Sequence, residues 1–247
     1  MKIVFLGVGG WISRPKLGFT SIAVLGRYGG LLLDAGEGVY HAMDRCGVDI
    51  NAIDTVFLSH RHGDHVLGIP TLVQLARYQH RRLRIVGSRD VIESVRALLS
   101  AVGVNEYEKH VDFIEVGHGD KISVGGYVLR FAEVRHTVPS LAVRVEYEGR
   151  CVVYSSDTTF TEALIPLSYG CDLLIHEVSG YSDDARLYGH STLYNAVEVA
   201  YRARVKRLAI VHFYIDTPPL RVEVLRSLAE EGVELIVPYP CYSIELE

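Results

Sequence analysis

One short stretch of the sequence, FLSHRHGDHVLG, gathers four side chains that can bind metal ions. His60, His62, Asp64 and His65 fall within six positions, directly after an apolar run. A helix cap or an exposed loop would explain one such residue, with Asp64 as the natural N-cap, but not all four. Imidazole and carboxylate without thiolate suit a catalytic zinc, iron or manganese centre better than a cysteine-rich structural zinc site. The stretch therefore predicts a metal-binding loop.

The same stretch predicts two neighbouring ions, because a tight loop cannot easily wrap four ligands round one. His60 and His62 would hold one ion, and Asp64 and His65 the other. Three more residues with metal-binding side chains stand at the ends of apolar runs. Each of them alone could instead cap a helix, form a turn or be a buried histidine that is hydrogen-bonded to the protein. Together they complete a set of five histidines and two aspartates, in which one carboxylate can bridge the ions. These further ligands are His136, Asp157 and His212.

Apolar and alternating runs predict the strands that must position these residues, and runs with three-and-four spacing predict helices. The strands are expected at 2–7, 21–26, 30–36, 54–60, 83–88, 111–116, 127–134, 141–147, 151–157, 172–178, 207–213 and 234–239. The helices are expected at 65–79, 90–103, 191–204 and 219–232. Because strands and helices occur in both halves, the pattern favours a layered α/β protein with mixed sheets.

Composition excludes some classes of protein. The 247 residues carry a formal net charge of −5, which argues against whole-surface attraction to nucleic acid or anionic membranes. No apolar run is long enough for a transmembrane helix, and the N-terminus reads as a first strand rather than a secretion signal. We therefore expect a cytoplasmic protein with no membrane partner.

The cysteines and the other polar residues add two expectations. The four cysteines are far apart and form no CxxC pair, so we expect buried thiols rather than disulfides or a zinc ribbon. Arginine outnumbers lysine by 20 to 5, and asparagine and glutamine together number only 5. Scarcity of thermolabile side chains favours a thermophilic source.

With these residues in place, the sequence resembles the metallo-β-lactamase fold hydrolases, whose hallmark is HxHxDH. The resemblance runs along nearly the whole chain and implies one domain over 1–247, a four-layer αβ/βα sandwich of two mixed β-sheets. It implies two divalent metal ions, with zinc preferred and manganese or iron as alternatives. The matching motifs are LLLDAGEG with Asp34, which would organise the metal loop, SHRHGDH, His136, YSSDT with Asp157, and VHF with His212.

Within that superfamily the chain is most similar to ribonuclease Z, the endonuclease that trims 3′ trailers from tRNA precursors. IHEVSG and GHSTLYNAVEVA resemble two further motifs of that family and carry Glu177 and His190. The resemblance pairs these two as a proton-transfer dyad, so the predicted catalytic residues are Asp64, Glu177 and His190. Helix capping by His190 is the structural alternative, and Ser191 could equally provide that cap.

The chain also differs from ribonuclease Z. Only 20 residues separate His136 from Asp157, so the arm that grips tRNA in that family is absent from this interval. The loop at residues 7–24 keeps Arg14, Pro15 and Lys16, and Cys241 and Tyr242 replace an aspartate-glycine pair. The basic stretch with Arg77, Arg81, Arg82 and Arg84 is interpreted as a charged helix end rather than a phosphate-binding patch.

The predicted function is that of a dinuclear zinc phosphodiesterase, in which a hydroxide that bridges the metals attacks a phosphodiester. The substrate would be RNA, such as a tRNA precursor, or alternatively a small phosphodiester. Other hydrolases of the fold that do not act on tRNA, an iron-dependent redox or sulfur-handling enzyme, and a non-catalytic member that binds nucleic acid are the rival readings. The family resemblance also makes a homodimer an expectation.

Overall fold

The computed structural model describes residues 1–12, 14–180, 182–213, 220 and 222–247. Two seven-stranded sheets are formed within these ranges. The first has the order β14-β1-β2-β3-β4-β5-β6, and the second β13-β12-β11-β10-β9-β8-β7. The strands are β1 Lys2–Gly7, β2 Ser21–Gly26, β3 Gly29–Leu33, β4 Ile53–Leu58, β5 Leu83–Gly87, β6 Val111–Glu115, β7 Lys121–Val124, β8 Tyr127–Val134, β9 Ser140–Tyr147, β10 Arg150–Tyr154, β11 Leu173–Glu177, β12 Arg207–Val211, β13 Glu234–Ile236 and β14 Ser243–Glu245.

The two sheets repeat one pattern of strand directions. In the first, β1, β2 and β3 pair antiparallel, and β4, β5 and β6 then continue in parallel from β3. In the second, β7 to β10 pair antiparallel, and β11, β12 and β13 continue in parallel from β10. The late strand β14 crosses back to pair with β1, so the second half of the chain completes the first sheet.

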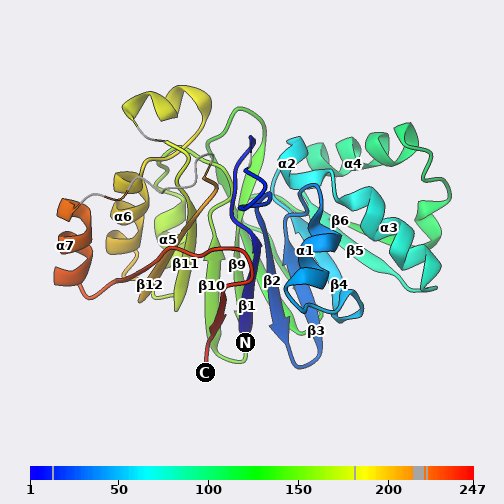
Figure 1. Cartoon of the computed structure of the whole chain (residues 1–247), viewed down its shortest axis with the longest axis horizontal. Coiled ribbons are helices and arrows are strands. Elements are labelled where there is room, and N and C mark those ends of the chain that lie inside the picture. Colours follow the sequence, from blue (N-terminus) through cyan, green and yellow to red (C-terminus); the bar gives the residue numbers. More distant parts are fainter. Residues whose placement is uncertain (13, 181, 214–219, 221) are drawn as a thin grey trace.

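The sheets face each other, and helices cover their outer faces (Figure 1). Apolar residues of both sheets form one core between them, and a second core lies between the first sheet and its helices. The four-layer arrangement of two mixed sheets expected from the sequence is therefore confirmed. The helices are α1 Val39–Arg45, α2 Gly63–Val66, α3 Ile69–Tyr78 and α4 Arg89–Ala101 beside the first sheet, and α5 Leu164–Ser168, α6 Leu193–Arg202 and α7 Val222–Glu230 beside the second.

The predicted strands are all present, but one predicted helix is divided and four short elements were not predicted. The helix expected over 65–79 is split into α2 and α3, because Gly68 packs closely against Gly36 and Pro70 opens the first turn of α3. Helices α1 and α5 and strands β7 and β14 were not predicted, since each is too short to give a clear period. The helix expected over 219–232 lies partly outside the described residues.

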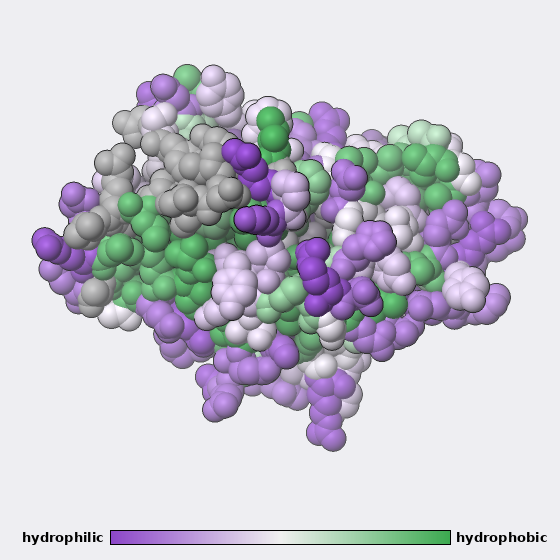
Figure 2. All heavy atoms as spheres, in the orientation of Figure 1, coloured by the Kyte–Doolittle hydropathy of each residue, from purple (hydrophilic) through white to green (hydrophobic). Residues whose placement is uncertain are grey.

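The carboxyl ends of the central strands meet at one edge of the molecule, which is the upper edge in Figure 1. Strands β3, β4, β10, β11 and β12 end there, and β8 runs in the same direction as β10. At the opposite, lower edge, hydrophilic side chains predominate (Figure 2). Residues that directly follow the central strands are thus collected at the upper edge, whichever half of the chain they come from. Among the described helices, none is both long and apolar enough to span a membrane.

The prediction of free thiols is wrong, because the described structure pairs all four cysteines. Cys46, at the end of α1, bonds to Cys241 just before β14, and Cys151 in β10 bonds to Cys171 just before β11. Spacing in the sequence could not reveal these pairs, since the first spans 195 positions and is formed only when β14 joins β1. Disulfides inside proteins of hyperthermophiles are an established exception to the usual cytosolic rule.

The two disulfides should contribute unequally to stability. Cross-linking restricts the unfolded chain more when the closed loop is longer, so the chain-entropy model gives about 5 kcal/mol for Cys46–Cys241 and about 3 kcal/mol for Cys151–Cys171. We expect the double variant C46S/C241S to lower the free energy of unfolding more than C151S/C171S. Denaturant unfolding of both variants and the parent, without reductant, measures this difference. Equal losses would contradict the loop-length argument.

Candidate metal centre

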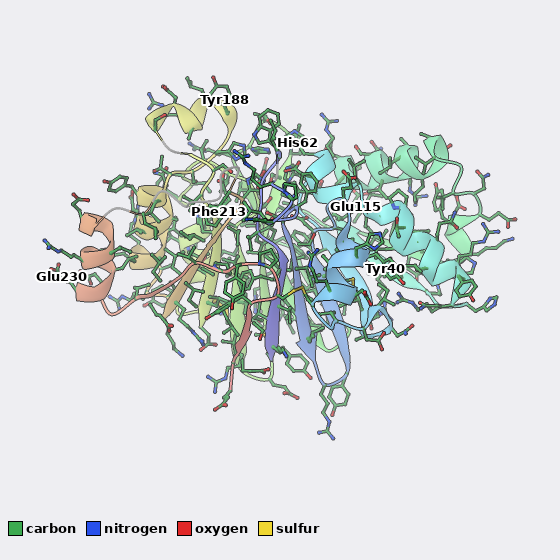
Figure 3. All side chains as sticks on the ribbon, in the orientation of Figure 1. Tyr40, His62, Glu115, Tyr188, Phe213 and Glu230 are labelled. Carbon is green, nitrogen blue, oxygen red and sulfur yellow. A yellow bond between two sulfur atoms is a disulfide. The ribbon has the colours of Figure 1, made fainter. Side chains whose placement is uncertain are left out.

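Residues that follow six different strands build the site. Asp34 follows β3, His60 follows β4, and His136 follows β8. Asp157 follows β10, while Glu177 ends β11 and His212 follows β12. His62, Asp64 and His65 lie on the loop and short helix α2 after β4, and His62 is seen at the upper edge in Figure 3. The structure therefore brings together every site residue that the sequence predicted.

The first group consists of His60, His62 and His136. The Nδ1 atom of His62 lies 3.1 Å from Nε2 of His60 and 3.1 Å from Nε2 of His136. Ligand atoms of all three rings lie within 4.8 Å of one another, so the group could hold one metal ion. Burial and the other histidines lower the pKa of His60 well below its usual value, which keeps this ring neutral and able to ligate.

The second group consists of Asp64, His65, Asp157 and His212. The Nε2 atoms of His65 and His212 lie 3.3 Å apart, and each lies 3.2 Å from Oδ2 of Asp64. These ligand atoms also lie within 4.8 Å of one another. Burial lowers the pKa of His65, but the charges of Asp157, Asp64 and Asp34 outweigh burial and raise it well above its usual value. The same negative potential would attract a metal cation.

Asp157 lies between the two groups. Its Oδ2 atom is 3.1 Å from Nε2 of His212, 3.4 Å from that of His65, 3.8 Å from that of His60 and 3.9 Å from that of His136. Its Oδ1 atom is buried and finds no hydrogen-bond partner among the residues that the structure describes. A buried, unpartnered carboxylate oxygen is costly, so this atom calls for a cation.

Hydrogen-bond acceptors of fixed direction set the tautomers of His60 and His136, the two rings on either side of His62. Ser59 Oγ donates to Asp34 Oδ2, so it must accept from Nδ1 of His60, 3.0 Å away. The carbonyl oxygen of Gly189 accepts from Nδ1 of His136 at 2.8 Å. In both rings the proton is therefore assigned to Nδ1, and the lone pair of Nε2 points into the site.

The second group is oriented in the same way. Oδ2 of Asp34 accepts from Nδ1 of His65 at 2.7 Å. Ser179 Oγ donates to the carbonyl oxygen of His212, so it accepts from Nδ1 of the same ring. In the neutral form of these rings the four Nε2 atoms therefore converge and offer their lone pairs to a cation, which would displace the proton that the raised pKa gives His65. Such an arrangement fits a metal centre, in which outer hydrogen bonds orient each ligating histidine.

Asp34 acts as the hub of these outer contacts. This fully buried carboxylate accepts from the backbone nitrogen and the hydroxyl of Ser59, from His65, and from the hydroxyl of Tyr154 at 2.8 Å. Sequence reasoning found Asp34 but missed Ser59, Tyr154 and Ser179. Hydroxyl residues at strand ends are common, so no signal in the sequence singled these three out.

Glu177 and His190 form the pair that the resemblance implied. Oε1 of Glu177 accepts from Nδ1 of His190 at 3.0 Å and from the backbone nitrogens of Thr158 and Ser191. Burial lowers the pKa of His190, but the charge and hydrogen bond of Glu177 outweigh burial and raise that pKa to about 9. His190 lines the same cavity as the metal-binding side chains.

The alternative roles as helix caps are not observed. The N-cap of α2 is His62, and Asp64 lies inside the helix with its carboxylate on His65 and His212. The N-cap of α6 is Thr192, which forms a capping box with Asn195, so neither His190 nor Ser191 provides it.

The strand ends carry strained backbone. Asp34, Ser156 and His212 have φ angles of 58°, 58° and 69°, in the left-handed region that non-glycine residues rarely adopt. Each such residue costs on the order of 1–3 kcal/mol and persists only where its surroundings enforce it. Here the conformation turns the backbone sharply at the end of each strand. The side chain of the metal-binding residue, or of a residue that hydrogen-bonds to one, therefore faces the place where the two sheets meet.

The basic stretch after α3 is used structurally. Arg82 pairs with Asp112, Arg84 lies 3.2 Å from Asp54, and Arg81 donates to the backbone carbonyls of Ile53 and Ile50. None of these arginines is among the residues that line the cavity at the metal centre. The pairings agree with the preference for a structural role over a phosphate-binding patch.

Comparison with known proteins places this site in a family. A family model described as β-lactamase superfamily domain matches residues 30–213. Ribonuclease Z from Ignicoccus hospitalis is 31% identical over an alignment of 273 residues, which takes in 89% of this chain and 90% of the relative. Because that alignment is longer than the 247 residues of this chain, the relative carries internal segments that this chain lacks.

Solved structures share the whole fold. The metallo-β-lactamase fold protein YhfI from Bacillus subtilis superimposes with a TM-score of 0.84 and 25% identity over 98% of both chains. The short form of human tRNase Z superimposes with a TM-score of 0.83 and 23% identity over 100% of both chains. The expected thermophilic source fits relatives from archaea such as Ignicoccus hospitalis.

The fold, the matched model and the convergent histidines define a metal-dependent hydrolase, and the chain belongs to the β-lactamase superfamily. Within that superfamily it is a member of the ribonuclease Z-like branch.

Replacing Asp34 by asparagine should weaken metal binding. An amide NH₂ in place of Oδ2 cannot accept from His65, so that ring is expected to move its proton to Nε2, where a metal would bind. Loss of such an outer partner typically costs 10- to 100-fold in metal affinity, and chelator competition measures it. Tyr154→Phe removes one donor but keeps the carboxylate, so it should cost less. Equal affinities for D34N and the parent would exclude this role for Asp34.

Proposed function

We propose that the protein is a dinuclear zinc-dependent phosphodiesterase. One ion would be held by His60, His62 and His136. The other would be held by the group of Asp64, His65 and His212, with the carboxylate of Asp157 shared between the two ions. Manganese or iron is the alternative metal. The observation that carries the proposal is the convergence of four ring nitrogens on Oδ2 of Asp157, from both sheets.

When bound, two such ions would supply Lewis acidity to a phosphodiester and to an attacking water. The remaining work falls to side chains of the chain itself. Glu177 fixes Nδ1 of His190, which lines the cavity, so the imidazolium can give the proton on its other nitrogen to a departing alkoxide. Asp64, which lines the same cavity, would orient the attacking water in addition to binding metal.

The substrate class follows from the relatives and from the cavity. Relatives named ribonuclease Z support RNA, and a tRNA precursor is the first candidate. A small phosphodiester is the second candidate, for two reasons. The chain lacks internal segments that the Ignicoccus relative carries, and Arg14 is the one lysine or arginine among the described residues that line the cavity. A polynucleotide normally needs several such contacts to its phosphates.

Metal loading should control activity. We expect protein loaded with zinc or manganese to hold about two ions per chain and to hydrolyse bis(p-nitrophenyl) phosphate, and a chelator to abolish both until metal is restored. Asp157→Ala should lose metal and turnover together, while Asp112→Ala, an exposed carboxylate paired with Arg82, should keep both. Elemental analysis and the release of nitrophenolate measure the two properties. Full activity without metal would overturn the proposal.

A 3′-extended precursor tRNA should be tested in parallel. A single cut just after the acceptor stem would support the first candidate substrate. Hydrolysis of the small ester with the tRNA left intact would support the second.

Loss of His190 should matter most for poor leaving groups. An alkoxide needs a proton as it departs, whereas p-nitrophenolate is stable without one, so His190→Ala should slow an RNA or alkyl ester by about 10²- to 10⁴-fold and the nitrophenyl ester much less. Metal content should stay unchanged. The ratio of kcat values on the two substrates provides the measurement, and an equal loss on both would argue against a proton-donating role.

The cytoplasmic location and the homodimer expected from the sequence stay predictions. Light scattering on the purified protein would test the second.

A further inference from the structure

The cavity at the metal centre is unusual in the side chains that form its mouth. It has a volume of about 1180 Å³ and is lined by large apolar side chains and by four of the proposed metal ligands, His62, Asp64, His136 and Asp157. Four of these apolar residues are strongly exposed: Trp11 by 64%, Ile12 by 59%, Leu67 by 47% and Tyr188 by 68%. Single exposed apolar residues are ordinary, but a set gathered round one cavity from three separate segments marks a binding site.

Trp11 directly follows a backbone segment that contacts the second metal group. The backbone nitrogen of Gly10 donates to the carbonyl oxygen of Phe213, and that of His212 donates to Val8. A Cβ atom at residue 10 would approach the ring of His212 to 3.0 Å, so the loop lies directly on this metal-binding side chain. The residue that follows Gly10 is therefore held at the mouth of the site.

Tyr188 is likewise next to a residue that contacts the first metal group. It ends the 3-10 helix η3, Asp183–Tyr188, and precedes Gly189, whose carbonyl oxygen accepts from His136. Figure 3 shows Tyr188 on this segment and His62 on its loop, both at the upper edge of the molecule. Thus one aromatic residue adjoins the backbone that contacts each metal group, and both line the same cavity.

We propose that Trp11, assisted by Tyr188, forms a subsite for a flat aromatic ring joined to the phosphate that is hydrolysed. The proposal rests on the phosphodiesterase function proposed above and names its substrate class, an aryl or nucleoside phosphodiester. An aromatic ring can stack on tryptophan and tyrosine whatever its pattern of hydrogen-bonding groups, while the metal centre holds the phosphate. Arg14 lines the same mouth and can face the phosphate.

The single tryptophan of the chain provides a direct test. Metal-loaded protein is titrated with two pairs of ligands. The first pair is phenyl phosphate and methyl phosphate, and the second is uridine 5′-phosphate and ribose 5-phosphate. In each pair only the first ligand carries an aromatic ring or base. We expect the ligand with a ring to quench the fluorescence of Trp11 and to inhibit more tightly than its partner. Stacking of this kind corresponds to roughly 5- to 150-fold in affinity. The second pair shows whether a nucleobase serves as the ring.

Variants separate this subsite from a general effect on the fold. Trp11→Ala should abolish the preference for phenyl over methyl phosphate while leaving inhibition by methyl phosphate unchanged, and Tyr188→Ala should reduce the preference. Tyr78→Ala, an exposed tyrosine on α3 outside this cavity, should keep it. Inhibition constants by competition with bis(p-nitrophenyl) phosphate give these ratios.

Two results would overturn the inference. One is equal inhibition by phenyl and methyl phosphate in the parent protein, and the other is a preference that survives in Trp11→Ala. Failure of the proposed function itself would look different, because then neither phosphate would bind and no phosphodiester would be hydrolysed with metal present.

Discussion

The physical constraint on which this structure depends is the burial of the carboxylates of Asp34 and Asp157 in one small volume with the ring nitrogens of several histidines. Asp157 and the imidazoles of His60, His65 and His212 are almost completely inaccessible, and their nitrogen and oxygen atoms converge. Such a group is unstable by itself and requires a cation, or protonation, at its centre. The surrounding hydroxyls, Asp34 and the strained strand ends all serve to keep the donors aimed at that centre.

The arrangement of the sheets explains how one chain can supply so many donors to one point. Parallel strands deliver their carboxyl ends to a common edge, and two such edges meet where the sheets face each other. His60 and His65 come from the first sheet, while His136, Asp157 and His212 come from the second. Neither half of the chain contains a complete ligand set for both proposed ions, so the site is a property of the packed sandwich.

Much of this could be predicted from the sequence, because strands with long apolar runs and ligands that directly follow them leave a local signal. The spacing of His60, His62, Asp64 and His65 sufficed to predict two neighbouring metal groups, and the structure forms both groups. Contacts between distant segments left no such signal. Tyr154 reaches Asp34 across 120 positions, Cys46 finds Cys241 across 195, and the helix break at Gly68 depends on the close approach of Gly36.

The return of β14 to the first sheet has a consequence for how the two halves relate to each other. By position β14 belongs to the second half, but by hydrogen bonding it covers the outer edge of β1. If the chain were divided between β6 and β7, the first piece would present β1 as an open edge, with unpaired backbone groups ready to join another molecule. The repeated strand pattern therefore does not make the halves separable modules, because one half carries the strand that protects the other from aggregation.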